Sequence, residues 1–88
     1  MELKDTYKLM TSDDYKDRFV AEYLQTKIRY QKLHDLVIKA KANALDFELT
    51  TPLEVLIDQK RTMGQYLEML EIRAVFENVD LVLKEETE

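Results

Sequence analysis

The sequence predicts an all-α protein: a long antiparallel hairpin of two helices with a short N-terminal segment, assembling as a homo-oligomer. The chain of 88 residues has one glycine, one proline and no cysteine, so few positions break a helix and no disulfide stabilises the fold. Its apolar residues recur at steps of three and four. A domain of this size buries only about 60% of its unfolded surface, which favours self-association.

We interpret the chain as one helical-hairpin domain over residues 1–88, beginning with an N-terminal arm over 1–11. The first long helix is predicted over 12–42. Its start is marked by Thr11 and Asp14, which resemble a capping box with aspartate in place of the usual glutamate or glutamine.

A second helix is predicted over 52–78. An N-cap threonine, a proline at the first helical position and a glutamate three residues after the cap mark its start, at Thr51, Pro52 and Glu54. Asn78 suits its C-terminal cap. The connection over 43–51 is short, so the two helices must lie antiparallel. The acidic tail over 79–88 is expected to be extended or frayed.

The first helix carries two apolar faces. One consists of Tyr15, Phe19, Tyr23, Tyr30, Leu33, Val37 and Ala40, and is expected to close the hairpin. The other lies roughly opposite and consists of Val20, Ala21, Leu24 and Ile28. The N-terminal arm offers a cover for one exposed face, through Leu3, Tyr7 and Met10 at helical spacing.

The second helix likewise has two sets of apolar residues, a main stripe and a smaller separate set. The main stripe consists of Leu56, Met63, Tyr66, Leu67, Leu70 and Ala74, while a separate apolar set consists of Met69, Ile72 and Phe76. About ten arm residues cannot cover two separate patches. We therefore expect both the Val20, Leu24 and Ile28 stripe and the Met69, Ile72 and Phe76 stripe to pack between protomers.

The charge of the chain argues against binding to long nucleic acid. Its net charge is −5, whereas nucleic-acid affinity comes mostly from neutralising phosphates with Lys and Arg. Residues 16–41 carry seven bases and three acids, and residues 42–88 carry four bases and eleven acids. The first half of the chain is therefore suited to a small anion, and the second half would repel a long polyanion.

No membrane partner is expected. The longest apolar runs fall far short of the roughly eighteen residues that a membrane span needs. The first ten residues also lack the apolar core of a signal peptide. We therefore expect a cytoplasmic protein.

We expect no enzymatic activity, no metal site and no cofactor. His34 is the single histidine; it falls on the polar side of its helix, where a solvated side chain is the simplest interpretation. The chain has no cysteine to serve as a nucleophile. The acidic pair Glu68 and Glu71 has no histidine at the spacing of a metal-binding motif.

The single glycine, Gly64, lies inside the second predicted helix. Phosphate-binding loops need several glycines, so Gly64 does not form one. A glycine at such a position lowers helix stability by about 1 kcal/mol relative to alanine. Two explanations stay open: a neighbouring helix or a ligand approaches closely there, or the glycine is merely tolerated.

Two segments resemble the helices of a known hairpin domain. They are DRFVAEYLQTKIRYQKLHDLV and LIDQKRTMGQYLEMLEIR, within about residues 15–75. The family is that of the anti-CBASS sponges, small phage proteins that sequester cyclic-nucleotide immune signals, and the same hairpin occurs in a class of anti-Thoeris sponges. The matching residues are Glu22, Lys27, Lys32, Leu33, Gln59, Met63, Tyr66, Leu67, Leu70 and Arg73.

The resemblance implies a homo-oligomer, specifically a hexamer, that holds cyclic di- or trinucleotides, or cyclic ADP-ribose-type signals, between protomers without cleaving them. It implies an anti-defence role in the cytoplasm of a bacterial host. Such ligands carry phosphates and flat rings, which Arg, Lys and aromatic side chains bind. The candidate ligand-binding residues are Tyr15, Lys16, Arg18, Phe19, Lys27, Tyr30, Arg61 and Arg73. Each aromatic residue among them also fits a core, and each base a solvated face.

Two other interpretations stay open. The chain fits a small helical adaptor that binds a host protein through an exposed apolar stripe. An all-helical enzyme similar to chorismate mutase is the other alternative, and it would bind a dicarboxylate among buried bases. The arginine spacing of that enzyme family has no match on the first predicted helix.

Overall fold

The computed structural model describes residues 1–81, and their regular structure is entirely helical. A 3₁₀ helix, η1 (Leu3–Thr6), leads into the short helix α1 (Tyr7–Met10). Two long helices follow, α2 (Tyr15–Lys41) and α3 (Leu53–Glu77). The prediction of an all-α fold is confirmed for the described residues.

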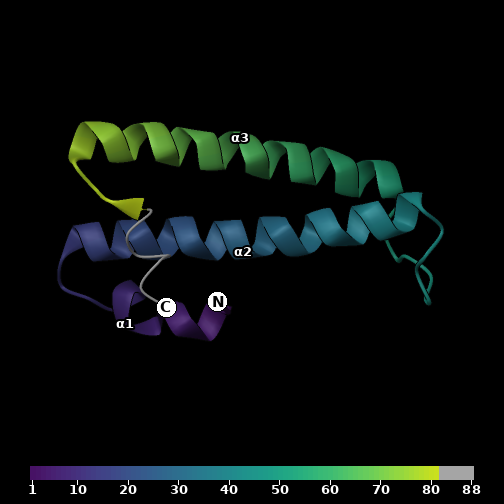
Figure 1. Cartoon of the computed structure of the whole chain (residues 1–88), viewed down its shortest axis with the longest axis horizontal. Helices are drawn as coiled ribbons and strands as arrows, with labels where there is room; N and C mark the ends of the chain where they lie inside the picture. Colours follow the sequence, from purple (N-terminus) through teal and green to yellow (C-terminus); the bar gives the residue numbers. More distant parts are fainter. Residues whose placement is uncertain (82–88) are drawn as a thin grey trace.

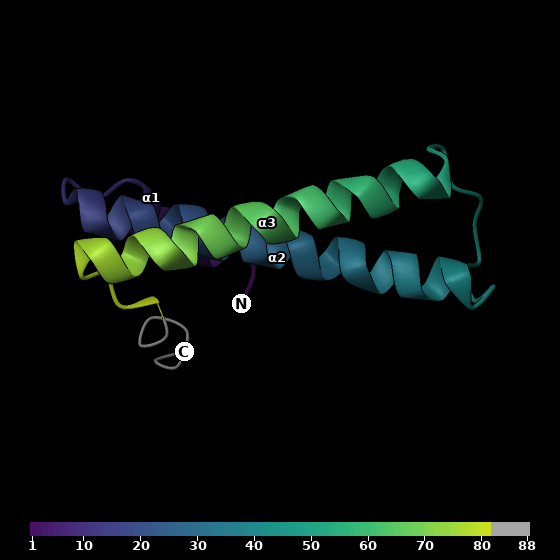
Figure 2. The same ribbon diagram turned by 90° about the horizontal axis from the view of Figure 1, so that it is seen from above.

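The helices stack in three layers, with α2 between α3 and the N-terminal helices (Figure 1). The 27 residues of α2 span about 40 Å at 1.5 Å per residue, close to the longest dimension of 43 Å. α2 and α3 run antiparallel and contact each other, as the hairpin prediction requires. Seen from above, they cross near their middles (Figure 2).

α2 begins at Tyr15, three residues later than predicted. Its N-cap is Asp14, whose carboxylate accepts a hydrogen bond from the Lys16 amide at 2.9 Å. The predicted capping role of Thr11 is wrong, because the Thr11 hydroxyl donates instead to the Tyr7 carbonyl at 2.9 Å. That bond closes the last turn of α1, so the two helices remain separate.

α3 begins at Leu53, one residue later than predicted, and Pro52 rather than Thr51 occupies its N-cap position. The ψ angle of Pro52 is 141°, which is extended. Its carbonyl already accepts a hydrogen bond from the Val55 amide at 3.1 Å. These are the properties of an N-cap, although Pro52 has no side-chain donor or acceptor with which to cap the helix.

Both long helices end at an asparagine in the left-handed conformation, Asn43 with φ 55° and Asn78 with φ 56°. The amide after each asparagine donates to the carbonyl five residues earlier, at 2.8 Å after Asn43 and 2.9 Å after Asn78. This is the Schellman motif, which satisfies carbonyls at a helix end. The predicted role of Asn78 is confirmed, and Asn43 ends α2 in the same way.

The core lies at one end of the hairpin, between the N-terminal half of α2 and the C-terminal half of α3. Its buried members are Phe19, Val20, Tyr23, Leu24, Leu67, Leu70, Ala74 and Leu81. Leu81 belongs to the tail that was predicted to be extended or frayed, so that prediction is wrong at this residue. The turn at Asn78 directs the chain back toward the core. The rest of the predicted tail, residues 82–88, lies outside the described residues.

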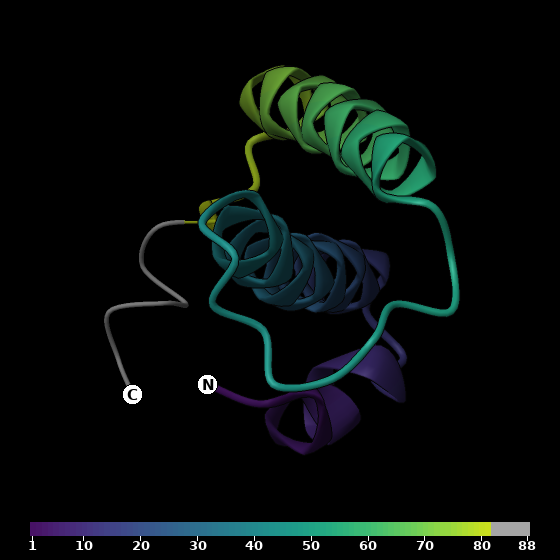
Figure 3. The same ribbon diagram turned by 90° about the vertical axis from the view of Figure 1, so that its right-hand side faces the viewer.

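The N-terminal arm covers the second apolar face of α2. Leu9 packs against the core cluster, and Val20 and Leu24 are each only 2% exposed within one protomer. The prediction that this face packs between protomers is therefore wrong. η1 and α1 lie against the side of α2 opposite α3 (Figure 3), and they occupy the space that a second protomer would need.

Of the three covering residues predicted in the arm, Leu3 is partly buried, whereas Tyr7 and Met10 are exposed. Tyr7 is 63% exposed and Met10 is 45% exposed, whereas Thr6 is fully buried. The Thr6 hydroxyl accepts a hydrogen bond from the Gln25 amide nitrogen at 2.8 Å. The cause is the 3₁₀ start of the arm, because three residues per turn place positions 3, 6 and 9 on one face.

The outer face of α3 has no cover among residues 1–81. Its large apolar side chains are all more than half exposed: Met69, Ile72, Val75 and Phe76, the last at 84%. We call these four residues the α3 outer patch. A patch of this kind on a small domain is typical of an interaction surface.

Candidate functional site

The two long helices approach each other closely where Tyr30 of α2 meets Gly64 of α3. A methyl group added to Gly64 would lie 3.3 Å from Cε1 of Tyr30, which is closer than carbon atoms normally pack. Both residues lie near the middles of their helices, where Figure 2 shows the crossing. Of the two explanations for Gly64, close approach of a neighbouring helix is the one that the structure supports.

A hollow of about 400 Å³ opens from this contact toward the end of the hairpin that carries the connection. It is lined by Tyr30, Ile57, Lys60, Arg61, Gly64, Gln65 and Glu68. Lys60 and Arg61 outnumber the single acid of the lining. Arg61 also pairs with Asp58 at 2.8 Å, on the exposed side of the helix. This basic hollow is suited to a phosphate, for which arginine and lysine supply charge-assisted donors.

A second hollow of about 300 Å³ lies on the other side of the contact. Its lining is Tyr23, Lys27, Tyr30, Gln31, Gly64, Leu67, Glu68 and Glu71. The Tyr23 hydroxyl donates to the Glu71 carboxylate at 2.7 Å, and the Lys27 ammonium lies 5.7 Å from the centroid of the Tyr23 ring. The lining has two acids and one base, so its carboxylates can accept hydrogen bonds from donor groups of a ligand. We call this second hollow acidic.

The two hollows share Tyr30, Gly64 and Glu68, and we call them together the crossing groove. Along the helix axes, Lys27 lies about 5 Å to one side of Tyr30, and Lys60 lies about 6 Å to the other side of Gly64. Lys60 and Arg61 outnumber Glu68 on one side of Tyr30, and Glu68 and Glu71 outnumber Lys27 on the other. The groove therefore has a net basic end, an aromatic middle and a net acidic end.

Three of the predicted ligand-binding residues lie together in the crossing groove: Lys27, Tyr30 and Arg61. The other five lie at the opposite end of the hairpin from the connection, where α2 begins and α3 ends. They are Tyr15, Lys16, Arg18, Phe19 and Arg73. One protomer thus has two separate groups of candidate residues.

Within the second group, Phe19 is a buried core residue, and its ring makes a cation–π contact with Arg73. The Arg73 guanidinium lies 4.7 Å from the centroid of the Phe19 ring and bonds to Glu77 at 3.0 Å. Arg73 is therefore fixed by a cation–π contact and an ion pair.

The remaining residues of this group belong to the start of α2. The Arg18 guanidinium donates to the Ser12 carbonyl at 2.6 Å, which ties the side chain back to the segment before the helix. Tyr15 is half exposed, and Lys16 is partly buried.

Sequence reasoning missed Lys60 and Glu68 as candidate site residues. Together with Gly64 they follow a strict four-residue step, which places all three on one flank of α3. The glycine inside the helix was the sequence signal that could have identified them. It marks a face of α3 that a neighbouring helix can approach closely, and residues four positions before and after it lie on that same face. Local periodicity alone does not show which helix lies opposite that flank.

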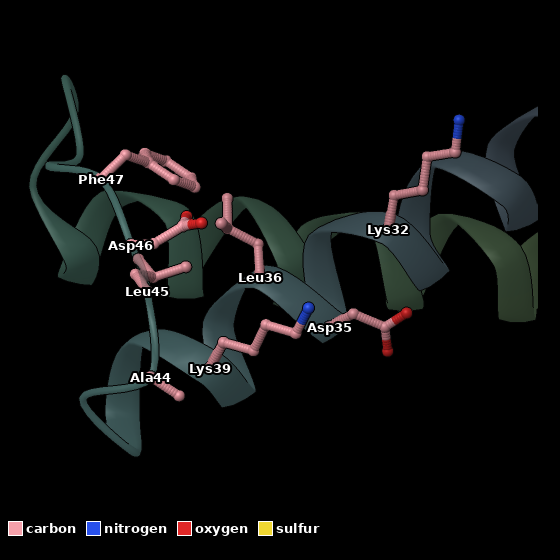
Figure 4. A pocket seen from close by; sticks show the side chains of 8 residues that line it. All are labelled: Lys32, Asp35, Leu36, Lys39, Ala44, Leu45, Asp46 and Phe47. Carbon is pink, nitrogen blue, oxygen red and sulfur yellow. The ribbon is translucent and has the colours of Figure 1, made fainter.

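Another hollow, of about 390 Å³, lies where the end of α2 meets the connection (Figure 4). Its lining is Lys32, Asp35, Leu36, Lys39, Ala44, Leu45, Asp46 and Phe47. Two lysines and two aspartates balance each other. Figure 4 shows Lys32 extending away from the residues of the connection. This hollow has weaker features for an anion than the basic end of the crossing groove.

His34 differs from its predicted solvated state. Its ring stacks on Tyr30 with centroids 6.4 Å apart and planes 14° apart. Its Nδ1 atom is buried and makes no hydrogen bond within residues 1–81. His34 therefore supports the position of Tyr30 through ring packing.

The opposite flank of the hairpin carries a hydrogen bond from the Tyr66 hydroxyl to the Glu22 carboxylate. This bond raises the pKa of Tyr66 above its ordinary value, and burial and the negative charge of Glu22 act in the same direction. The positive charge of Arg73 opposes the shift. Tyr66 therefore stays protonated in the folded protein and serves as a donor between the helices.

No cluster of three or more histidine, aspartate or glutamate side chains within residues 1–81 is arranged to hold a metal ion. In that same part of the chain, none of the helices combines the length and the apolar character of a membrane span.

An antiparallel helical hairpin with an open charged groove is the architecture of a small helical binding protein. The family model described as Sequestin matches residues 13–76, which include all of α2, α3 except its last residue, and the whole crossing groove. This chain belongs to the Sequestin family, which confirms the resemblance to the anti-CBASS and anti-Thoeris sponges. No curated protein and no solved structure matched the chain.

Membership in a sequestering family indicates the general role of the chain. It implies a binding and sequestering role.

Proposed function

We propose that this protein is a phage anti-defence sponge that binds a cyclic di- or trinucleotide signal, or a cyclic ADP-ribose-type signal, and retains it without cleavage. The crossing groove is the observation that carries the proposal. It places Tyr30 between the Lys27 side and the Lys60 and Arg61 side of one continuous surface. A flat base and a phosphate need an aromatic face and adjacent cations.

Retention of the signal needs rigidity rather than chemistry. The groove lies between two long helices that are linked by two hydrogen bonds, one from Tyr23 to Glu71 and one from Tyr66 to Glu22. Side chains on packed helices lose little freedom when a ligand binds, which increases affinity. Hydrolysis of a phosphodiester needs an activated water, usually from a metal or a positioned base. The proposed function requires neither.

We propose that the protein acts as a homo-oligomer, with a hexamer as the expected state. The support is the α3 outer patch, whose members Ile72 and Phe76 lie one turn apart on the face directed away from α2. The second group of predicted ligand residues, including Arg18 and Arg73, is then available to a neighbouring protomer's site.

The test is recovery of the ligand after binding. Purified protein is incubated with 3′,3′-cyclic GMP–AMP, a cyclic triadenylate or cyclic ADP-ribose, separated from free ligand and denatured, and the released small molecules are identified by mass. Intact ligand with and without a chelator is the expected result. Accumulation of a linear product that depends on the protein and disappears with the chelator would identify a nuclease.

The same exposed patch also favours a second function, an adaptor that binds a host protein helix. An amphipathic helix fits an apolar strip whose members lie three and four residues apart, as Met69, Ile72 and Phe76 do. A protein that stays monomeric and retains none of the three ligands would support the adaptor.

A further inference from the structure

Two exposed apolar surfaces lie at opposite ends of the hairpin. One is the α3 outer patch, near the C-terminal end of α3. The other is the hollow where the end of α2 meets the connection, whose volume is about 390 Å³ and whose lining includes Leu36, Leu45 and Phe47. We call it the connection hollow. Phe47 is 57% exposed and Phe76 of the patch is 84% exposed, so neither ring is covered within residues 1–81.

The two ends also differ in charge. Residues 27–51, which form the end of α2 and the connection, carry five bases and three acids, a net charge of +2. Residues 65–80, which carry the patch, have one base and four acids, a net charge of −3. Two patches in contact would therefore bring like charges together, whereas a patch on a connection hollow brings opposite charges together. Charge favours contact between the unlike surfaces of two copies.

The positions of the two surfaces prevent one protomer from joining its own. Figure 1 shows the connection and the C-terminal end of α3 at opposite ends of a molecule whose longest dimension is 43 Å. The patch is directed away from α2, whereas the connection passes on the side of α2 that is remote from α3 (Figure 3). One protomer can therefore present its patch to one neighbour and its hollow to another.

We propose that the α3 outer patch of one protomer docks on the connection hollow of a second copy of this chain, with the Phe76 ring seated beside Leu36 and Phe47. This inference rests on the self-association in the proposed function, and it adds the partner surface and the symmetry of the contact. The hollow has room for an aromatic ring, and its apolar lining matches the apolar patch.

The electrostatic attraction comes from the whole end of the hairpin rather than from the hollow alone. Lys32 and Lys39 balance Asp35 and Asp46 in the lining of the hollow. The surplus of positive charge comes from the other bases within residues 27–41, which are all exposed. An attraction between exposed charges of this kind speeds association and weakens as the ionic strength rises.

The proposed contact has a consequence for symmetry. A contact between unlike surfaces is heterologous, so its repetition closes into a ring or continues as a filament. A closed ring of protomers agrees with the expected hexamer. Contact between two patches would instead give a two-fold dimer, and it would leave every connection hollow without a partner.

The experiment is sedimentation velocity of the full chain at micromolar concentration, with circular dichroism to check the helical content of each variant. The wild type is expected to sediment as an oligomer. Phe76→Ser and Phe47→Ser are each expected to weaken association at least about tenfold, because each removes a large apolar side chain from the contact. Tyr7→Ser, at an aromatic position 63% exposed on α1, is the matched control and should assemble as the wild type does.

Mixing the two phenylalanine variants tests the unlike contact directly. The Phe76→Ser protein keeps an intact hollow and the Phe47→Ser protein keeps an intact patch. The mixture should therefore form a dimer with one copy of each, identified by native mass spectrometry, while each variant alone stays a monomer. If two patches paired instead, Phe47→Ser alone would assemble like the wild type, and that result would overturn the inference.

Ionic strength separates the two arrangements a second time. Raising the salt from about 0.05 M to about 0.5 M should shift the wild type toward smaller species if opposite charges meet, and toward larger species if two acidic patches meet. The second result would overturn the inference, as would a wild type that is a monomer at both concentrations. Recovery of an intact ligand from the same monomeric preparation would then show that the sponge function stands without this contact.

Discussion

The hydroxyl of Tyr23 on α2 donates a hydrogen bond to the carboxylate of Glu71 on α3 at 2.7 Å, across 48 residues of sequence. Tyr23 is buried and Glu71 is exposed, so the bond joins the core to the wall of the crossing groove. It fixes the two long helices in one register.

Tyr23→Phe is expected to lower the free energy of unfolding by about 1 kcal/mol, the usual net value of one hydrogen bond. Urea denaturation followed by circular dichroism measures the change. Tyr7→Phe on the exposed side of α1 is the matched control and should leave stability unchanged. Equal stability of Tyr23→Phe and wild type would show that the bond does not form in solution.

Leu24→Ala is expected to destabilise the folded protomer by about 2–5 kcal/mol, because Leu24 is almost fully buried in the core cluster. Ile38→Ala, at a position of α2 that is 51% exposed and lies outside the α3 outer patch, should cost less than about 0.5 kcal/mol. Denaturant titration of both variants compares the two sites. A mild effect at Leu24 would mean that this side chain is not buried in solution as the structure has it.

Phe76→Asp is expected to break the proposed oligomer without unfolding the helices. A charge on the α3 outer patch is solvated in the free protomer and costly when buried between protomers. Sedimentation velocity at micromolar concentration should show a smaller species with an unchanged helical spectrum. A wild-type protein that sediments as a monomer would remove the basis for self-association.

Alkaline pH is expected to destabilise the wild type more than Tyr66→Phe. The hydrogen bond to Glu22 raises the pKa of Tyr66 in the folded state above its unfolded value of about 10. The unfolded chain therefore loses this proton first, so stability that is complete below about pH 10 falls as pH rises toward the folded pKa. Unfolding free energies measured between about pH 8 and 11 should decline less steeply in Tyr66→Phe. Parallel curves would contradict this coupling.

Much of the secondary structure was predictable because its signals are local. The three- and four-residue apolar steps predict two long helices, and the left-handed preference of asparagine predicts the end of α3 at Asn78. The start of α2 was predicted less well. Asp14 and Thr11 are both good caps, and the choice between them depends on where α1 ends.

The candidate site was only partly predictable. Lys27 and Tyr30 stand close together on α2, so one helix already indicates an aromatic and a basic side chain on the same flank. Lys60 and Glu68 belong to the site only because the crossing places their flank of α3 opposite Tyr30. The spacing of residues along one helix shows which side chains share a face, but it does not show which other helix packs against that face.

The sequence by itself determined that this chain forms two long amphipathic helices joined by a short connection, since spacing and caps act over a few residues. Tertiary structure alone decided which apolar faces are covered. The 3₁₀ start of the arm directs Thr6 and Leu9 onto α2, which leaves the α3 outer patch exposed. Tertiary structure also decided that Gly64 meets Tyr30, because the register of two packed helices depends on how distant side chains interlock.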